Sequence, residues 1–260
     1  IEMIEMHLTL EKDITVIQGQ LGAKAIATIS TFLTKENRKI WMNRLFNLAF
    51  NTLENGGNVE KQLTWFDLLL FCASSDSSLK NMKQLLDGEL SFENLTVDQD
   101  KRWRIVNRLC AYNFSDAWGI IAQEKGNDPG DLGKKKAYLA SVSIPNSNEK
   151  SKNWDSFITN KENSSTDYMR YGMSGFFWKN QDELLAPFID PFFEKLADIY
   201  KNKDMHYSSA FGNVLFPAIF NPKMILNKTE SFLEINEDLP KLCKKGLIEN
   251  CDHLKRRIPI

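Results

Sequence analysis

The sequence predicts an all-α fold, and three observations support this prediction. Apolar residues recur at the three- and four-residue spacing of a buried helix face along most of the chain. The 260 residues include only 13 glycines and 8 prolines, fewer than the many turns of an all-β fold require. The Asn55-Gly56-Gly57-Asn58 loop is flanked by segments of helical, not alternating, spacing. We therefore expect helix pairs stacked side by side in a curved array.

In the first half of the chain, each helix is expected from its apolar spacing and its end signals. Apolar spacing predicts helices over 45–53 and 63–71, and a further helix that ends at Gly88, since glycine commonly terminates helices. A helix over 101–112 is expected because Trp103, Val106 and Cys110 share one face. Thr96 and Gln99 have the spacing of a capping box before it.

The second half of the chain gives similar signals. A helix over 115–125 should end at Gly126, and Asp128-Pro129 should cap the next one, through about residue 142. Residues 144–148 are expected to form a loop. Over 185–200 the apolar residues again share one helical face, but Pro191 should kink or break the helix near Ile189–Asp190. Because no linker rich in proline or serine interrupts the sequence, residues 1–260 are expected to form one domain.

Composition and charge exclude several classes of protein. The chain is 42% hydrophobic and 26% charged, which is typical of globular proteins, and its net charge is −1. This balance favours neither a nucleic-acid partner nor a membrane surface. No apolar run reaches the ~20 residues of a membrane span. The four cysteines are too few for a secreted disulfide framework, and the N-terminus is not a signal peptide, so we expect a cytoplasmic protein.

The sequence shows no catalytic machinery and no metal site of its own. His7 and Glu11 have helical i,i+4 spacing, but a catalytic zinc needs three protein ligands, and no His-Glu-x-x-His sequence occurs. Cys243, Cys251 and His253 lack the spacing of a zinc finger and a fourth ligand. We therefore predict that this chain alone neither binds zinc stoichiometrically nor cleaves aminoacyl substrates.

Residues 168–178 are the segment least explained by helical packing, because aromatic residues lie beside glycines and a lone arginine. Two interpretations remain open. The segment is either a helix–helix corner filled by aromatic side chains, or one wall of a peptide-binding groove. In the second case Arg170, Tyr171 and Trp178 are the candidate contacts, since a guanidinium pairs with a peptide carboxylate and tyrosine and tryptophan add amphipathic surface.

Several blocks of sequence resemble the C-terminal domain of aminopeptidase N-type zinc metallopeptidases, in particular the bacterial type that is similar to the endoplasmic-reticulum aminopeptidase domain. The resemblance covers roughly residues 14–258. It rests on six blocks of sequence, two of which contain Glu149-Lys-Ser-Lys-Asn-Trp154 and Gly175-Phe-Phe-Trp178. The blocks are residues 79–89, 95–109, 127–136, 149–154, 175–188 and 239–256.

This resemblance implies a HEAT- or armadillo-like array of antiparallel helix pairs that forms a bowl over a catalytic domain. In such enzymes the zinc ligands and the catalytic glutamate lie upstream, so no catalytic residue is assigned here. Zinc is expected in the full-length enzyme, with an upstream catalytic domain of the same chain and peptides as partners. The sequence starts with Ile1 and not Met, and the first helices of the domain are expected before it.

Two functions of different classes follow from these observations. The chain is either the C-terminal domain of a zinc aminopeptidase, covering the active site and lining the peptide cavity, or a stand-alone helical-repeat module that binds a protein or peptide. An upstream reading frame encoding His-Glu-x-x-His distinguishes them.

Overall fold

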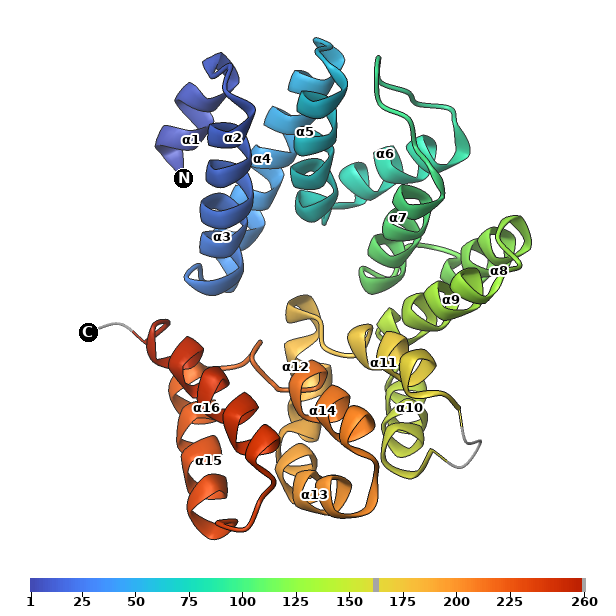
Figure 1. The fold of residues 1–260 in the computed structure, drawn as a ribbon. Helices are drawn as coiled ribbons and strands as arrows, with labels where there is room; N and C mark the ends of the chain where they lie inside the picture. The colour runs from blue at the N-terminus through green and yellow to red at the C-terminus, as the bar shows by residue number, and fades with distance from the viewer. Residues whose placement is uncertain (161–163, 259–260) are drawn as a thin grey trace. The chain divides into compact units, whose positions relative to one another are not determined.

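The computed structural model describes residues 1–160 and 164–258, and every regular element in these ranges is helical, which confirms the all-α prediction (Figure 1). The chain divides into two compact units, residues 1–117 and residues 118–260. Each unit is built around its own buried side chains. The single domain and the curved array expected from the sequence stay predictions.

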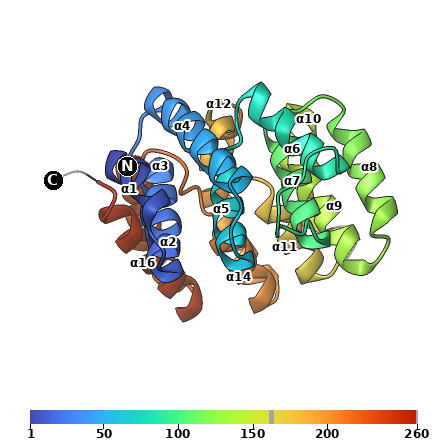
Figure 2. The ribbon, with the colours of Figure 1, turned by 90° about the horizontal axis from the view of Figure 1, so that it is seen from above.

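The first unit contains the helices up to α7. Its longest helices, α4 and α5, are joined by the turn at residues 55–58 and pack against each other (Figure 2). Asn58 begins α5, because its side chain accepts a hydrogen bond from the Lys61 amide at 2.8 Å. The helices are α1 (Glu2–His7), α2 (Ile14–Gln18), a π-helix (Gly19–Ile26), α3 (Ala27–Thr31), α4 (Lys35–Glu54), α5 (Val59–Cys72), α6 (Asp76–Asp87) and α7 (Gln99–Ala111).

In the first unit, α5 packs against both α4 and α7. Trp65 of α5 and Trp103 of α7 are almost completely buried, and the burial of Trp103 confirms the prediction from its apolar stripe. Arg108 of α7 is also buried, and its Nε donates to the Ala73 carbonyl at 2.7 Å. Because a buried guanidinium needs acceptors, this contact satisfies the charged group and also holds the end of α5 against α7.

The second unit contains the helices from α8 onward. A large cluster of aromatic and aliphatic side chains forms its core, with Trp154, Phe176 and Phe211 at its centre. The helices are α8 (Ala117–Asn127), α9 (Asp131–Ser143), α10 (Ser147–Thr159), α11 (Thr166–Ser174), α12 (Asp182–Leu185), α13 (Ile189–Asn202), α14 (Met205–Val214), α15 (Pro222–Ile235) and α16 (Lys241–Lys255).

Two of the predicted helix ends are confirmed. Gly88 ends α6 in the left-handed conformation, with φ +78°, which glycine adopts without steric cost. The break near Ile189 also occurs: a 3₁₀ turn at Ala186–Phe188 separates α12 from α13. Pro191 lies in the first turn of α13, where its missing N–H is not needed.

Other predicted boundaries were wrong, because side-chain geometry at the caps overrides a simple motif match. Asp98, and not the Thr96 capping box, begins α7 by accepting from the Lys101 amide at 3.0 Å. Asp128 was predicted to cap α9, but its amide donates to the Glu124 carbonyl at the end of α8. The N-cap of α9 is Gly130 instead. The loop expected at 144–148 is shorter, because Asn146 caps α10 at once. The helix expected to end at Gly126 continues to Asn127.

The turn between α8 and α9 depends on Gly133. A Cβ added there would lie 1.9 Å from the Asp128 carbonyl oxygen, so the backbone would have to move. We expect Gly133→Ala to lower the free energy of unfolding by ~1–3 kcal/mol, the usual range for overpacking. Gly126→Ala is the matched control, since its Cβ would meet no atom within 4 Å and alanine favours helix. Urea unfolding of both variants tests this, and equal stabilities would contradict it.

Candidate functional site

The candidate segment begins on α11 and packs closely against α9. A Cβ at Gly172 would lie 2.2 Å from the Tyr138 ring, and a Cβ at Gly175 would lie 2.2 Å from the Leu139 carbonyl oxygen. Both glycines are therefore needed for the two helices to approach each other. The rings of Tyr138 and Tyr168 stack across the same contact, with centroids 4.7 Å apart. The glycine–aromatic pattern is thus explained by a packed helix–helix corner, one of the two interpretations open from the sequence.

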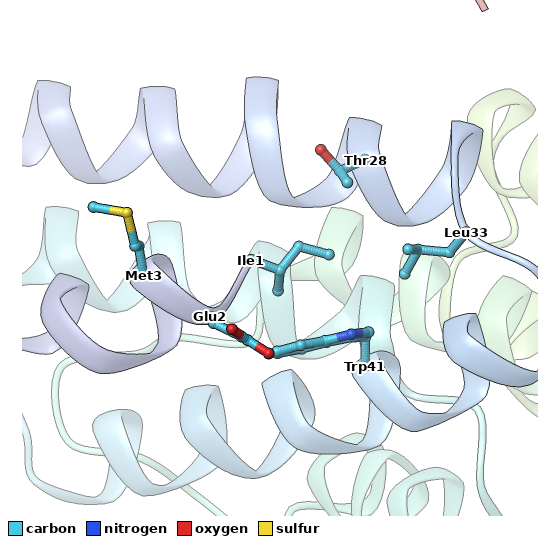
Figure 3. Close-up of a pocket in the computed structure, with 6 residues that line it drawn as sticks. All are labelled: Ile1, Glu2, Met3, Thr28, Leu33 and Trp41. Carbon is cyan, nitrogen blue, oxygen red and sulfur yellow. The ribbon is translucent and has the colours of Figure 1, made fainter. Parts of the chain in front are cut away.

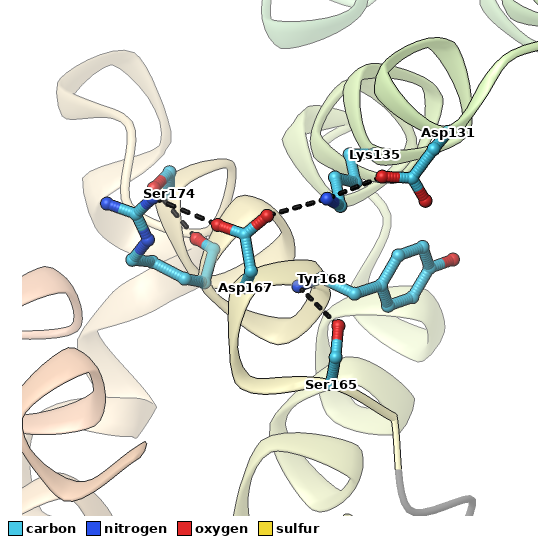
Figure 4. A network of polar contacts seen from close by, with 7 residues as sticks. Asp131, Lys135, Ser165, Asp167, Tyr168 and Ser174 are labelled. Carbon is cyan, nitrogen blue, oxygen red and sulfur yellow. Dashed lines mark hydrogen bonds and ion pairs between the residues drawn. The ribbon is translucent and has the colours of Figure 1, made fainter. Parts of the chain in front are cut away.

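An ion-pair network ties the exposed edge of this corner together (Figure 4). Lys135 Nζ of α9 lies 2.6 Å from Oδ2 of Asp131 and 2.6 Å from Oδ2 of Asp167 at the start of α11. Oδ1 of Asp167 accepts from the guanidinium of Arg170 at 3.0 Å. Hydrogen bonds from Lys135 and Arg170 hold the pKa of Asp167 below its ordinary value. Because Asp131, Asp167 and Arg170 are exposed and only Lys135 is partly buried, the network contributes little to stability, but it sets where Arg170 is held.

The three candidate contacts lie in different surroundings. Arg170 is exposed, with 57% of its side chain accessible, and Tyr171 beside it on α11 is half-buried. Trp178 follows the end of α11 and is also half-buried. Its indole Nε1 donates to Ser143 Oγ at 3.1 Å. The guanidinium and the indole therefore have separate partners, Asp167 and Ser143. Arg170 is the most exposed of the three candidates.

Sequence reasoning missed Lys150, which lies on α10 and is fully buried. Its Nζ donates to the carbonyls of Val142 and Phe176 at 2.7 and 2.6 Å, and lies 5.0 Å from the centroid of the Phe176 ring. Burial lowers the pKa of Lys150 to about 7. A signal for this burial was present, because Lys150 precedes Trp154 and Phe157 at i,i+4 and i,i+7 on one helix face.

The end of α9 receives further bonds from the same segment. The side-chain amide of Gln181 donates to the Ser143 carbonyl at 2.8 Å, and the Ser143 hydroxyl donates to the Leu139 carbonyl at 2.9 Å. Together with Lys150, these contacts bind the residues after α11 to the carbonyl end of α9. These bonds hold the segment that follows Arg170 and Tyr171 against α9.

A hollow in the first unit has a volume of about 400 Å³ (Figure 3). Its residues are Ile1, Glu2, Met3, Thr28, Leu33 and Trp41. The guanidinium of Arg44 lies 4.1 Å from the Trp41 ring centroid and forms an ion pair with Glu5. Apart from the Glu2 carboxylate and the Thr28 hydroxyl, the side chains of this lining are largely apolar.

The side chains weighed as metal ligands are not brought together. His7 ends α1 and Glu11 follows a 3₁₀ turn, so the two do not share a helix. Cys243 and Cys251 are buried free thiols of α16, and burial raises the pKa of both. Burial disfavours the thiolate, which is the form of a cysteine that acts as a nucleophile. Over residues 1–160 and 164–258, no group of three metal-ligating side chains is found.

None of the helices over residues 1–160 and 164–258 is long and apolar enough to cross a membrane.

Comparison with known proteins identifies the family. The sequence profile of the ERAP1-like C-terminal domain matches residues 1–256. The chain belongs to this family. It is also 26% identical over 225 residues to Aminopeptidase N of Streptomyces lividans, a match that covers 86% of this chain and 26% of that protein. The chain thus spans about a quarter of the length of this curated relative, and the resemblance seen in the sequence is confirmed.

Proposed function

We propose that this chain is the C-terminal helical domain of a zinc-dependent aminopeptidase, in which it covers the active site and lines the cavity that holds the peptide. The family match over residues 1–256 carries this proposal, supported by the similarity to a protein named Aminopeptidase N. Zinc and the catalytic base are assigned to an upstream domain of the same polypeptide. The proposal includes a single domain over residues 1–260 arranged as a HEAT- or armadillo-like array.

The part of this chain that would touch the peptide is the exposed edge of α11. Asp167 holds the guanidinium of Arg170 through one of its nitrogens, and an arginine has five N–H donors in a planar fork. The remaining donors can pair with the carboxylate at the far end of a peptide. Tyr171 and Trp178 would add amphipathic contact surface. Small substrates lack this distant carboxylate, so they would not reach Arg170.

The test belongs in the full-length enzyme. Arg170→Ala should raise KM for peptides by roughly tenfold, the effect of losing ~1.5 kcal/mol from one charge-assisted hydrogen bond. Cleavage of small chromogenic aminoacyl substrates should be unchanged. Lys152→Ala is the matched control, since Lys152 is also exposed and pairs with a carboxylate three residues away. An equal loss with both substrate types, or an equal effect of both variants, would refute the role of Arg170.

A separate observation tests the assignment of the whole chain. Reading the encoding gene upstream should reveal His-Glu-x-x-His and a further glutamate ligand in the same frame. Purified full-length protein should then release N-terminal amino acids in a chelator-sensitive way. An upstream sequence without these ligands would favour the stand-alone binding module.

A further inference from the structure

A groove in the second unit lies apart from the corner that carries Arg170. Two hollows of about 480 and 370 Å³ meet at Ile235, the last residue of α15. The first lies between α13 and α15, and the second lies between α13 and the residues that follow α15. We call these two hollows together the α13–α15 groove.

The floor and the ridge of the α13–α15 groove are apolar. The rings of Phe193 and Phe232 lie 6.0 Å apart in the first hollow, and the half-buried Tyr200 and Leu239 line the second. Ile235 stands between the hollows with 82% of its surface exposed. A ligand that covers such an exposed aliphatic side chain removes its apolar surface from water, which favours binding.

The rim of the groove has an excess of negative charge. Asp190, Glu194, Glu237 and Asp238 contribute four carboxylates, against two ammonium groups from Lys201 and Lys228. Lys228 is already paired with Asp190 at 2.6 Å. Lys244 of α16 donates to the backbone carbonyl of Glu237 and is not part of the lining.

The end of α15 adds to this negative potential. The carbonyl end of a helix carries a partial negative charge, which a basic side chain in the last turn usually offsets. The last turn of α15 contains no basic residue. The side-chain amide of Asn236 donates to the Phe232 carbonyl at 2.8 Å, which partly caps this end with a neutral group. A cation beside Ile235 would therefore meet both the helix end and the carboxylates of Glu237 and Asp238.

We propose that the α13–α15 groove binds a short peptide segment that carries basic side chains next to aliphatic or aromatic ones. Its apolar side chains would cover Ile235 and fill the hollows on either side, while its basic side chains would pair with the rim. From Asp190 to Lys201 the groove follows ~17 Å of helix, which matches about five extended residues. This charge preference is opposite to that of Arg170, so the groove is a separate interaction surface.

The direct test is the binding of a fluorescein-labelled hexapeptide of alternating lysine and leucine, with blocked ends, measured by fluorescence anisotropy with the whole chain. Ile235→Ser and Glu194→Lys should each weaken binding at least fivefold, and higher salt should weaken it as well. Leu132→Ser and Asp155→Lys are the matched controls. They alter an exposed leucine on α9 and an exposed aspartate on α10 and should leave the Kd within twofold.

Four outcomes would overturn the proposal: no binding, equal binding of a peptide with glutamate in place of lysine, equal weakening by the control variants, or a groove occupied by a second copy of the chain. The last would appear as a concentration-dependent increase in mass that Ile235→Ser abolishes. All four substituted residues are exposed, so the variants should retain the helical circular dichroism of the parent protein. The result does not depend on aminopeptidase activity, so it can fail while the proposed function stands.

Discussion

Replacing Lys150 with alanine should lower the free energy of unfolding by ~2–4 kcal/mol. The change removes the donor to the Val142 and Phe176 carbonyls and leaves a cavity in the core of the second unit. Each buried acceptor left without a donor costs ~1–3 kcal/mol, and truncation of a large buried side chain adds a cavity cost. Relief of the desolvation cost of the buried amine offsets part of this loss. Urea unfolding monitored by circular dichroism measures the change.

Lys150→Met separates the two contributions, because methionine fills most of the same volume without donating a hydrogen bond. We expect its stability to lie between those of the wild-type protein and the alanine variant. The near-ultraviolet circular dichroism of Trp178 and the neighbouring aromatic residues should change in both variants. Lys150 donates to the carbonyl of Phe176, which precedes Trp178 by two residues. An alanine variant as stable as the wild-type protein would show that Lys150 is not the tie between α9 and this segment.

The same lysine should make stability depend on pH. Burial lowers the folded-state pKa of Lys150 to about 7, whereas the unfolded chain has the ordinary value near 10.4. Between these values the unfolded state binds more protons, so stability should rise with pH by up to ~1.4 kcal/mol per unit. Below pH 7 both states are protonated and Lys150 contributes no slope. Comparing the wild-type protein with Lys150→Met at pH 7 and pH 9 tests this, and parallel profiles would contradict it.

Trp103→Ala should be the second large effect, with a loss of ~3–5 kcal/mol. Trp103 is 2% exposed in the core of the first unit. Its neighbours Arg102 and Arg104 donate hydrogen bonds to the Leu86 carbonyl and to Asp67. Removing the indole would therefore leave a cavity that the neighbouring arginines cannot fill. Trp118→Ala is the control, because Trp118 is 51% exposed and its truncation should cost far less. Similar melting temperatures for the two variants would refute the anchoring role of Trp103.

The sequence by itself determined where most helices lie and which of their residues are buried. The stripe through Trp103, Val106 and Cys110, the end of α6 at Gly88 and the break before Ile189 were all predicted and all occur. Helix ends depend on the backbone conformation of a few consecutive residues, and buried helix faces depend on apolar residues that recur every 3.6 residues. Short stretches of sequence are therefore enough to predict both.

Only the tertiary structure decided which side chains meet. Lys150 is buried because its acceptors come from Val142, eight residues earlier, and Phe176, twenty-six residues later. Gly172 is required because Tyr138 of another helix lies against it. The packed corner and the ion pairs around Arg170 could therefore be named as alternatives but not built from the sequence. Helix formation is a local property of the chain, whereas the choice of partner follows from packing between residues far apart in sequence.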